Sequence, residues 1–188
     1  MMINGGNIKK GGYIMFKGEP HLVTLTEFVS PGKGSAFMRT KLKSLKTGSV
    51  VEFTFKSVEM VEEADVSTVE MQYLYQDGED YVFMNPRSFE QTTVPGIVMS
   101  DYIGYLLPEQ TMYVVFFNDK PIGIRFPNKV TLKVVYAEDT VAGGRINAPK
   151  KKVKLETGYE VEVPLFIKVG ESVIIDTSTG LYVSRSNE

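Results

Sequence analysis

The 188-residue chain contains no cysteine and no tryptophan, and His21 is its single histidine. Without cysteine it can form no disulfide and offers no thiolate to a metal. One histidine also excludes a zinc site built on histidines, and a Ser-His-Asp triad unless His21 serves it. The chain lacks any run of about 18 apolar residues, so we expect no membrane span. Its polar start, MMINGGNIKKGG, has no apolar signal-peptide core. These absences favour a cytoplasmic protein, and we expect no metal or other cofactor.

Charge is distributed unevenly along a chain whose net charge is only −2. Residues 1–57 hold nine lysines and arginines against three acidic residues, a balance of +6. Residues 58–128 hold three against twelve, or −9, and residues 129–188 hold nine against eight, or +1. Such asymmetry indicates an N-terminal end that faces a polyanion and a solubilising middle, although surface charge that is simply uneven remains an alternative.

Strand patterns dominate the first third of the sequence. GYIMFKGEPHLVTLTEFV predicts two strands joined at Lys17-Gly18-Glu19-Pro20, and SAFMRTKLKSLKTGSVVEFTFKS predicts two more joined at Lys46-Thr47-Gly48. Four or five strands within about 60 residues are typical of a small SH3-like barrel. The acidic stretch VEMVEEADVST then predicts a break, so we place the first domain at residues 1–63.

Strand patterns restart twice more. EMQYLYQDGEDYVFMN and TMYVVFFNDKPIGIRFP predict hairpins, and SDYIGYLL between them predicts a short helix with Ser100 as N-cap and Pro108 after its end. This arrangement predicts an OB-type barrel over residues 64–128. Strands restart near Lys129 and are interrupted by a polar connection, DTVAGGRINAPKKKVKLETG, which predicts a second OB-type barrel over 129–188. The expected fold is all-β, with three consecutive small β-barrels.

The stretch SPGKGSAF, residues 30–37, places Lys33 between two glycines and predicts a bare, tight turn. It is no P-loop, because Glu27 occupies the position of the first glycine and Gly34 follows the lysine. A nucleophilic lysine would need a lowered pKa, usually from burial, which such a tip does not offer. Lys33 is therefore either a solvated hairpin lysine or a long cation that reaches where a barrel cannot enter.

The strand after this turn carries a row of cations. Period-two alternation places Arg39, Lys41 and Lys43 on one face, with Lys46 beyond them. These residues are candidates for RNA phosphate contacts or form a solvated face. The same ambiguity applies to the lysines at 150–152. The carboxylates of the middle segment favour a solvated acidic face over a catalytic pair.

Tyrosines of the middle segment raise a separate question, because exposed tyrosines on an OB barrel can stack on bases. Tyr73, Tyr75 and Tyr81 alternate in a way that favours core packing for most of them.

Three blocks of the sequence resemble bacterial translation elongation factor P. They are PGKGSAFMRTKLKSLKTGSVVEFTFKSVEMVEEADV, MQYLYQDGEDYVFMNPRSFEQ and ETGYEVEVPLFIKVGESVIIDTSTGLYVSR, and the resemblance extends essentially from end to end. It implies an SH3-like domain followed by two OB domains in an L-shaped, tRNA-like outline. It also implies a non-enzymatic factor that binds both ribosomal subunits and the peptidyl-tRNA between the peptidyl and exit sites, and that relieves stalls at consecutive prolines.

The resemblance also implies roles for individual residues. Lys33 would face the CCA end of the peptidyl-tRNA and would be the target of a lysine-modifying enzyme, which in many members adds a β-lysyl group. Pro31, Gly32 and Gly34 would set the loop geometry. A loop holding Gly143, Gly144 and Arg145 would approach the messenger RNA near the exit-site codon. Here this loop lacks the family's KPA motif, and Ser30 stands where a basic residue is common. We expect a monomer.

Two other classes of function compete with a translation factor. An OB-type module for single-stranded nucleic acid or oligosaccharide would place its cations along an OB groove, whereas residues 58–128 carry −9. An enzyme that uses Lys33 would need a pocket and partner groups that the sequence does not show. A paralogue tuned to other stalls or to initiation would remain within the first class.

Overall fold

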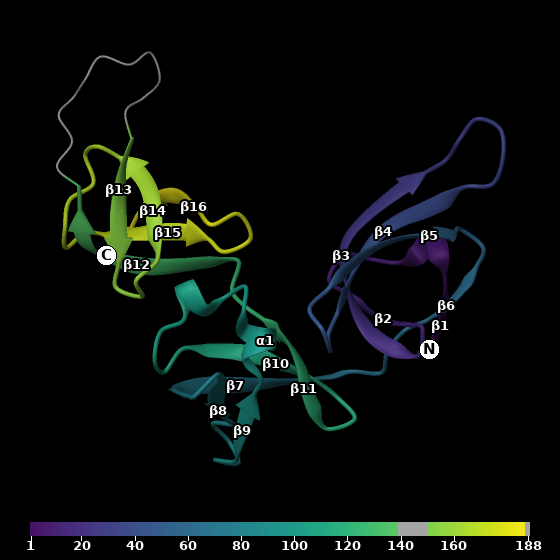
Figure 1. Cartoon of the computed structure of the whole chain (residues 1–188), viewed down its shortest axis with the longest axis horizontal. Coiled ribbons are helices and arrows are strands. Elements are labelled where there is room, and N and C mark those ends of the chain that lie inside the picture. Colours follow the sequence, from purple (N-terminus) through teal and green to yellow (C-terminus); the bar gives the residue numbers. More distant parts are fainter. Residues whose placement is uncertain (139–149, 187–188) are drawn as a thin grey trace.

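The computed structural model of the protein describes residues 1–138 and 150–186, and within them strands dominate. Figure 1 shows three groups of strands in a bent row, with the second group at the corner. Helical structure in these residues is limited to η1 (Gly5–Asn7), α1 (Gly96–Met99) and η2 (Ile103–Tyr105). None of the described helices is long and apolar enough to cross a membrane. The expected all-β architecture is confirmed.

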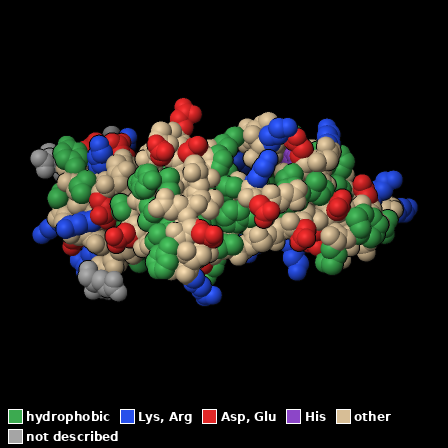
Figure 2. Space-filling view, turned by 90° about the horizontal axis from the view of Figure 1, so that it is seen from below, with side chains coloured by type: hydrophobic (Ala, Val, Ile, Leu, Met, Phe, Trp, Pro, Cys, Tyr) green, Lys and Arg blue, Asp and Glu red, His purple; other side chains and the backbone are tan. Residues whose placement is uncertain are grey.

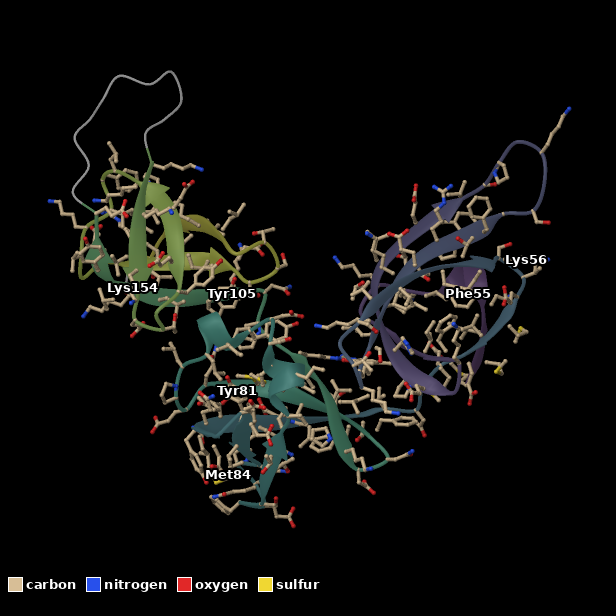
Figure 3. All side chains as sticks on the ribbon, viewed as in Figure 1. Phe55, Lys56, Tyr81, Met84, Tyr105 and Lys154 are labelled. Carbon is tan, nitrogen blue, oxygen red and sulfur yellow. The ribbon has the colours of Figure 1, made fainter. Side chains whose placement is uncertain are left out.

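The first group is a four-stranded antiparallel sheet in the order β2-β3-β4-β5. Its strands are β2 (Tyr13–Phe16), β3 (Glu19–Val29), β4 (Phe37–Ser44) and β5 (Val50–Lys56). Lys17 and Gly18 connect β2 to β3 with φ values of 52° and 81°, the left-handed conformation that a two-residue hairpin turn requires. Figure 3 shows Phe55 turned into this group and Lys56 turned away, as strand alternation demands.

A small second sheet closes the first group. Strand β1 (Met2–Asn4) pairs antiparallel with β6 (Met60–Glu62), and Ile3 lies opposite Val61. The sequence predicts only a polar start and an acidic break at these two places. That expectation was wrong for β1 and β6, because each strand is three residues long and is stabilised by a partner more than 50 residues away in sequence.

The second group is a five-stranded sheet in the order β11-β10-β7-β8-β9. Its strands are β7 (Ser67–Asp77), β8 (Asp80–Met84), β9 (Gln91–Val94), β10 (Thr111–Phe117) and β11 (Lys120–Arg125). Helix α1 lies between the third and fourth strands, as an OB-type barrel predicts. The predicted N-cap was wrong, since Ser100 follows α1 and its hydroxyl donates to the carbonyl of Ile97 at 3.0 Å. Helix α1 begins instead after Pro95.

The third group repeats the pairing order of the second, as β14-β13-β12-β15-β16. Its strands are β12 (Lys129–Ala137), β13 (Lys150–Leu155), β14 (Glu160–Pro164), β15 (Ser172–Asp176) and β16 (Leu181–Arg185). The sequence pattern predicts a polar connection that includes the lysines at 150–152, but these lysines form the start of strand β13. Pro164 ends β14, which lies at the end of the strand order, where a residue without an N–H is tolerated. The domain boundaries after residues 63 and 128 stay a prediction.

The three groups are joined in two different ways. The second and third groups share one continuous cluster of buried side chains that runs from Met71 to Ile175. Tyr105 and Tyr159 meet within it edge to face, with ring centroids 4.9 Å apart, and Figure 3 shows Tyr105 between the two groups. The first and second groups meet through a smaller cluster centred on Tyr13, Ala64 and Val115.

Candidate nucleic-acid interface

The loop between β3 and β4 is a slim, exposed tip. Both strands continue beyond the rest of the first group before the chain turns, so the loop projects from the molecule (Figure 1). Every residue from 30 to 35 is exposed. Gly34 has a φ of +107°, which favours glycine, and a Cβ added at Gly32 would meet no atom within 4 Å. A tip of this kind occupies little volume around Lys33.

Lys33 is exposed at this tip, and it has no ion pair or side-chain hydrogen bond among the residues that the structure describes. The loop leads into strand β4 rather than into a helix, so the phosphate cradle of a P-loop is absent here. An exposed ammonium lacks the burial that would activate a lysine nucleophile. The geometry leaves Lys33 free to contact a partner by charge.

Strand β4 alternates as the sequence predicted. Met38 and Leu42 are buried in the first group, whereas Arg39 and Lys41 on the opposite face are exposed. Each of these exposed cations forms an ion pair: Arg39 lies 3.6 Å from Glu27, and Lys41 lies 3.0 Å from Glu52. Both pairs follow from strand register, because Glu27 is opposite Arg39 and Glu52 is opposite Lys41.

Sequence reasoning did not identify these carboxylate partners. The signal was present for Glu27, since a hairpin centred on Lys33 places residue 27 directly across from residue 39. Exposed pairs of this kind contribute only about 0–1 kcal/mol. An RNA phosphate can therefore displace the carboxylates at little cost, and phosphate contacts by Arg39 and Lys41 stay a prediction.

Lys43 and Lys46 lie in different surroundings from Arg39 and Lys41. The Lys43 ammonium lies 2.5 Å from a carboxylate oxygen of Asp101 in the second group, and the lysine side chain is only 20% exposed. Lys46 lies 2.9 Å from Glu19, and its hydrogen bond holds the pKa of that carboxyl below its usual value. The structure thus places Lys43 at the junction of two groups, where its side chain is less available to RNA than the other three.

The tyrosines of the second group mostly face its core. Tyr73 and Tyr81 are buried, while Tyr75 is 52% exposed. A bulge between Tyr73 and Tyr75 breaks the alternation and turns Tyr75 outward. Two of the three tyrosines therefore pack as the sequence favoured, and no row of exposed rings for base stacking remains among them.

Acidic side chains form a solvated surface rather than a metal centre. On the face shown in Figure 2 they are spread along the length of the molecule, interspersed with lysines and arginines. Within residues 1–138 and 150–186, no cluster of three or more acidic or histidine side chains could hold a metal ion. His21 is buried beside the ring of Phe16, and its Nδ1 lies 3.0 Å from the Glu19 carbonyl. It serves no triad in this position.

The remaining predicted site is only partly described. Gly143, Gly144 and Arg145 lie outside the described residues, so their approach to messenger RNA stays a prediction. The lysines that follow lie on β13, where Lys150, Lys152 and Lys154 are exposed and Lys151 is half-buried. Figure 3 shows Lys154 at the surface of the third group. Glu160 and Glu162 of β14 lie opposite Lys154 and Lys152, so this face carries both signs of charge.

Comparisons with known proteins cover the three groups in order. Residues 4–61 match the elongation factor P KOW-like domain, residues 66–124 match the elongation factor P OB domain, and residues 130–185 match the elongation factor P C-terminal domain. Elongation factor P from Leptospira biflexa is 44% identical over 181 residues, which cover 96% of each chain. The same factor from Treponema denticola is 41% identical, with 99% of this chain and 100% of the relative covered.

Solved structures give a more distant likeness. The structure described as eukaryotic translation initiation factor 5A from Methanococcus jannaschii superposes with a TM-score of 0.52 at 22% identity. It covers 66% of this chain and 92% of its own. At that identity the likeness shows the fold alone.

Three consecutive barrel-like groups, matched in order and over nearly their whole length, define a translation factor and not an enzyme. More narrowly, the chain belongs to the elongation factor P family. This membership implies interaction with the ribosome and with tRNA.

Proposed function

We propose that the protein binds the ribosome between the peptidyl and exit sites. There it promotes peptide bond formation at consecutive prolines by positioning the CCA end of the peptidyl-tRNA. The observation that carries this proposal is the exposed Lys33 on a slim tip that projects beyond the first group of strands. Family membership supports the ribosome and tRNA as partners, and the exposed tip supports Lys33 as the residue that acts.

The chemistry of the stall explains why such a tip is sufficient. Proline is a poor nucleophile and a constrained donor, so its reaction suffers from poor alignment of the two substrates. Orientation of reacting groups can lower a barrier by several kcal/mol, up to about 7–11 kcal/mol in well-aligned intramolecular reactions. A cation that holds the tRNA end in place supplies this effect without donating a catalytic group. Lys33 is such a cation, and nothing on the described part of the chain covers it.

The face of β4 would support the tip by binding phosphates. Arg39 and Lys41 lie on the strand that leaves the loop and point to solvent. On binding RNA, each would exchange its exposed carboxylate partner for phosphate, which is favoured because condensed counterions are released from the RNA. Arg39 can form a bidentate contact, whereas Lys41 acts as a point charge.

Two further partners belong to this proposal. A modifying enzyme would extend Lys33, and the exposed residues 30–35 would give that enzyme access to the side chain. The segment that holds Gly143, Gly144 and Arg145 would approach messenger RNA near the exit-site codon. A general OB-type binding module is not favoured, because Tyr73 and Tyr81 are buried and cannot form a stacking platform.

Synthesis of a peptide through a run of prolines on purified ribosomes tests the proposal. The wild-type protein should raise the rate of synthesis. The acceleration given by Lys33→Ala should be at least about tenfold smaller, which corresponds to about 1.4 kcal/mol in the activation barrier. Lys120→Ala is the matched control, because Lys120 is also an exposed lysine at a hairpin end. Equal rates for wild type and Lys33→Ala would show that Lys33 is not the working residue.

Modification is tested separately by intact mass measurement of the protein from its native source. The expected result is extra mass on the intact protein that peptide mapping then assigns to the peptide holding Lys33. An unmodified peptide would mean that this member works with a plain lysine.

A further inference from the structure

A groove lies between the first and second groups of strands, away from the Lys33 loop. It has a volume of about 940 Å³. Its walls come from both groups: one wall is the segment from Asn7 to Ile14, and the other is the end of β11 with the residues that follow it. The buried ring of Tyr13 forms part of the floor, and Gly123 lies so close to it that a Cβ there would be 2.6 Å from the Tyr13 hydroxyl. The two groups therefore meet at the bottom of the groove and separate above it.

Three cations line this groove. Lys9 and Lys10 belong to the first wall, Arg125 belongs to the second, and all three are exposed. Within residues 1–138 and 150–186, none of them forms an ion pair. The four candidate phosphate ligands on and beyond β4 are all paired with carboxylates, whereas the three cations of the groove need not give up such a partner to bind an external anion.

The groove also offers neutral donors and one flat aromatic pair. Asn7 and Asn128 contribute side-chain amides, one from each wall. Tyr102 stacks on Phe126 with ring centroids 4.9 Å apart and an interplanar angle of 8°. These groups add hydrogen bonds and an apolar surface beside the cations, a combination suited to a sugar–phosphate backbone.

Few acidic groups oppose such a ligand. Glu63 is the acidic residue among those that line the groove, and its carbonyl accepts a hydrogen bond from the N-terminal ammonium of Met1. Asp65 lines a smaller adjoining hollow that shares Tyr13 and Arg125 with the groove. The charge at the groove is therefore net positive, although one of its walls belongs to the strongly acidic segment 58–128.

We propose that this groove is a second phosphate-binding site, which takes a segment of RNA backbone between the first and second groups of strands. RNA is favoured over an isolated phosphate because the cations come from two opposite walls and the groove is many times larger than one phosphate group. A backbone held there would contact both groups at once and would stabilise their mutual orientation. The proposal rests on the proposed function only in taking RNA as the partner, since it makes no use of Lys33.

Fluorescence anisotropy with a labelled 12-nucleotide RNA and the full chain tests this site. Replacing the three cations together, by Lys9→Gln, Lys10→Gln and Arg125→Gln, should weaken binding at least about tenfold. It should also reduce the slope of log K against log salt by about 2, since each phosphate contact to a single strand contributes about 0.7. The matched control removes the same charge from exposed sites outside the groove, by Lys17→Gln, Lys120→Gln and Lys168→Gln. This control variant should change the RNA affinity and the salt slope by less than half as much as the groove variant does.

Backbone amide shifts on RNA addition give a second measurement that does not depend on any variant. We expect the largest shifts at Gly11, Gly12, Arg125 and Asn128. Shifts confined to residues 30–44 would overturn the proposal, as would equal effects of the groove variant and the control. Tighter binding of a hexaglutamate peptide than of the RNA would overturn the choice of RNA as occupant.

Lys33→Ala distinguishes this proposal from the proposed function. Loss of proline-run activity with unchanged groove shifts supports both proposals. Unchanged activity with intact groove shifts contradicts only the role of Lys33 in the proposed function.

Discussion

The Lys43 ammonium on β4 lies 2.5 Å from a carboxylate oxygen of Asp101, which follows helix α1 in the second group. This pair joins two groups that otherwise meet through a small apolar cluster around Tyr13 and Val115. Asp101 is 63% exposed and Lys43 is 20% exposed, so the pair lies at the rim of the contact. The strand that carries the Lys33 tip is thereby tied directly to the corner of the molecule.

Asp101→Asn should let the first and second groups vary more in their mutual orientation. It should change the free energy of unfolding by only about 0–1 kcal/mol, because the pair lies at the rim of the contact, with Asp101 63% exposed. Small-angle X-ray scattering and residual dipolar couplings should show a wider range of orientations. Glu52→Gln breaks the Lys41 pair within the first group and is the control. If both variants give the same couplings as wild type, the Lys43–Asp101 pair does not set the angle.

Charge reversal at Arg39 and Lys41 should weaken ribosome binding and flatten its dependence on salt, since fewer counterions would be released. Neutralising their partners by Glu27→Gln and Glu52→Gln should act in the opposite direction, because the cations would then be free. Filter binding at several salt concentrations measures both effects. Identical affinities across salt for all four variants would identify this surface as merely solvated.

Gly180→Ala should destabilise the protein by about 1–3 kcal/mol more than Gly158→Ala. Both glycines have positive φ, 72° and 85°, so the backbone strain is similar. A Cβ at Gly180 would overlap the Tyr159 hydroxyl, which donates to the Gly180 carbonyl at 3.1 Å, whereas Gly158 has open space. Urea unfolding of both variants checks the difference. Equal destabilisation would mean that the third group accommodates a Cβ at Gly180 without displacing Tyr159.

Stability should fall as the pH rises above about 10, the ordinary pKa of tyrosine. Burial, and next the neighbouring Tyr159 hydroxyl, raise the pKa of Tyr105 above that value in the folded protein. The unfolded chain then loses its proton first, so folding is disfavoured by up to about 1.4 kcal/mol per pH unit for this group. Chemical denaturation between pH 8 and 11 should show a shallower fall for Tyr105→Phe. An unchanged slope would contradict the assignment.

The sequence predicted the tip and the cationic strand well, because both depend on local rules. Glycines around Lys33 imply a bare turn wherever the chain folds, and a period of two places Arg39 and Lys41 on one face of any strand. The same rules failed for β1 and β6, and they missed the bulge that turns Tyr75 outward. Neither a three-residue strand nor a bulge is encoded by its own residues alone, since both depend on the partner strand.

By itself, the sequence determined the all-β class and the resemblance to elongation factor P, and the structure and the comparisons confirm both. It also predicted the bare turn at Lys33 and the shared face of Arg39 and Lys41, and both are exposed in the structure. Only the tertiary structure showed that Arg39, Lys41, Lys43 and Lys46 each form an ion pair with a carboxylate. It also showed that Lys9, Lys10 and Arg125 line one groove and form no ion pair with any residue that the structure describes. The physical reason is distance along the chain. Periodicity fixes which face a side chain takes within its own strand, whereas the neighbour on another strand or barrel is set by how these elements pack.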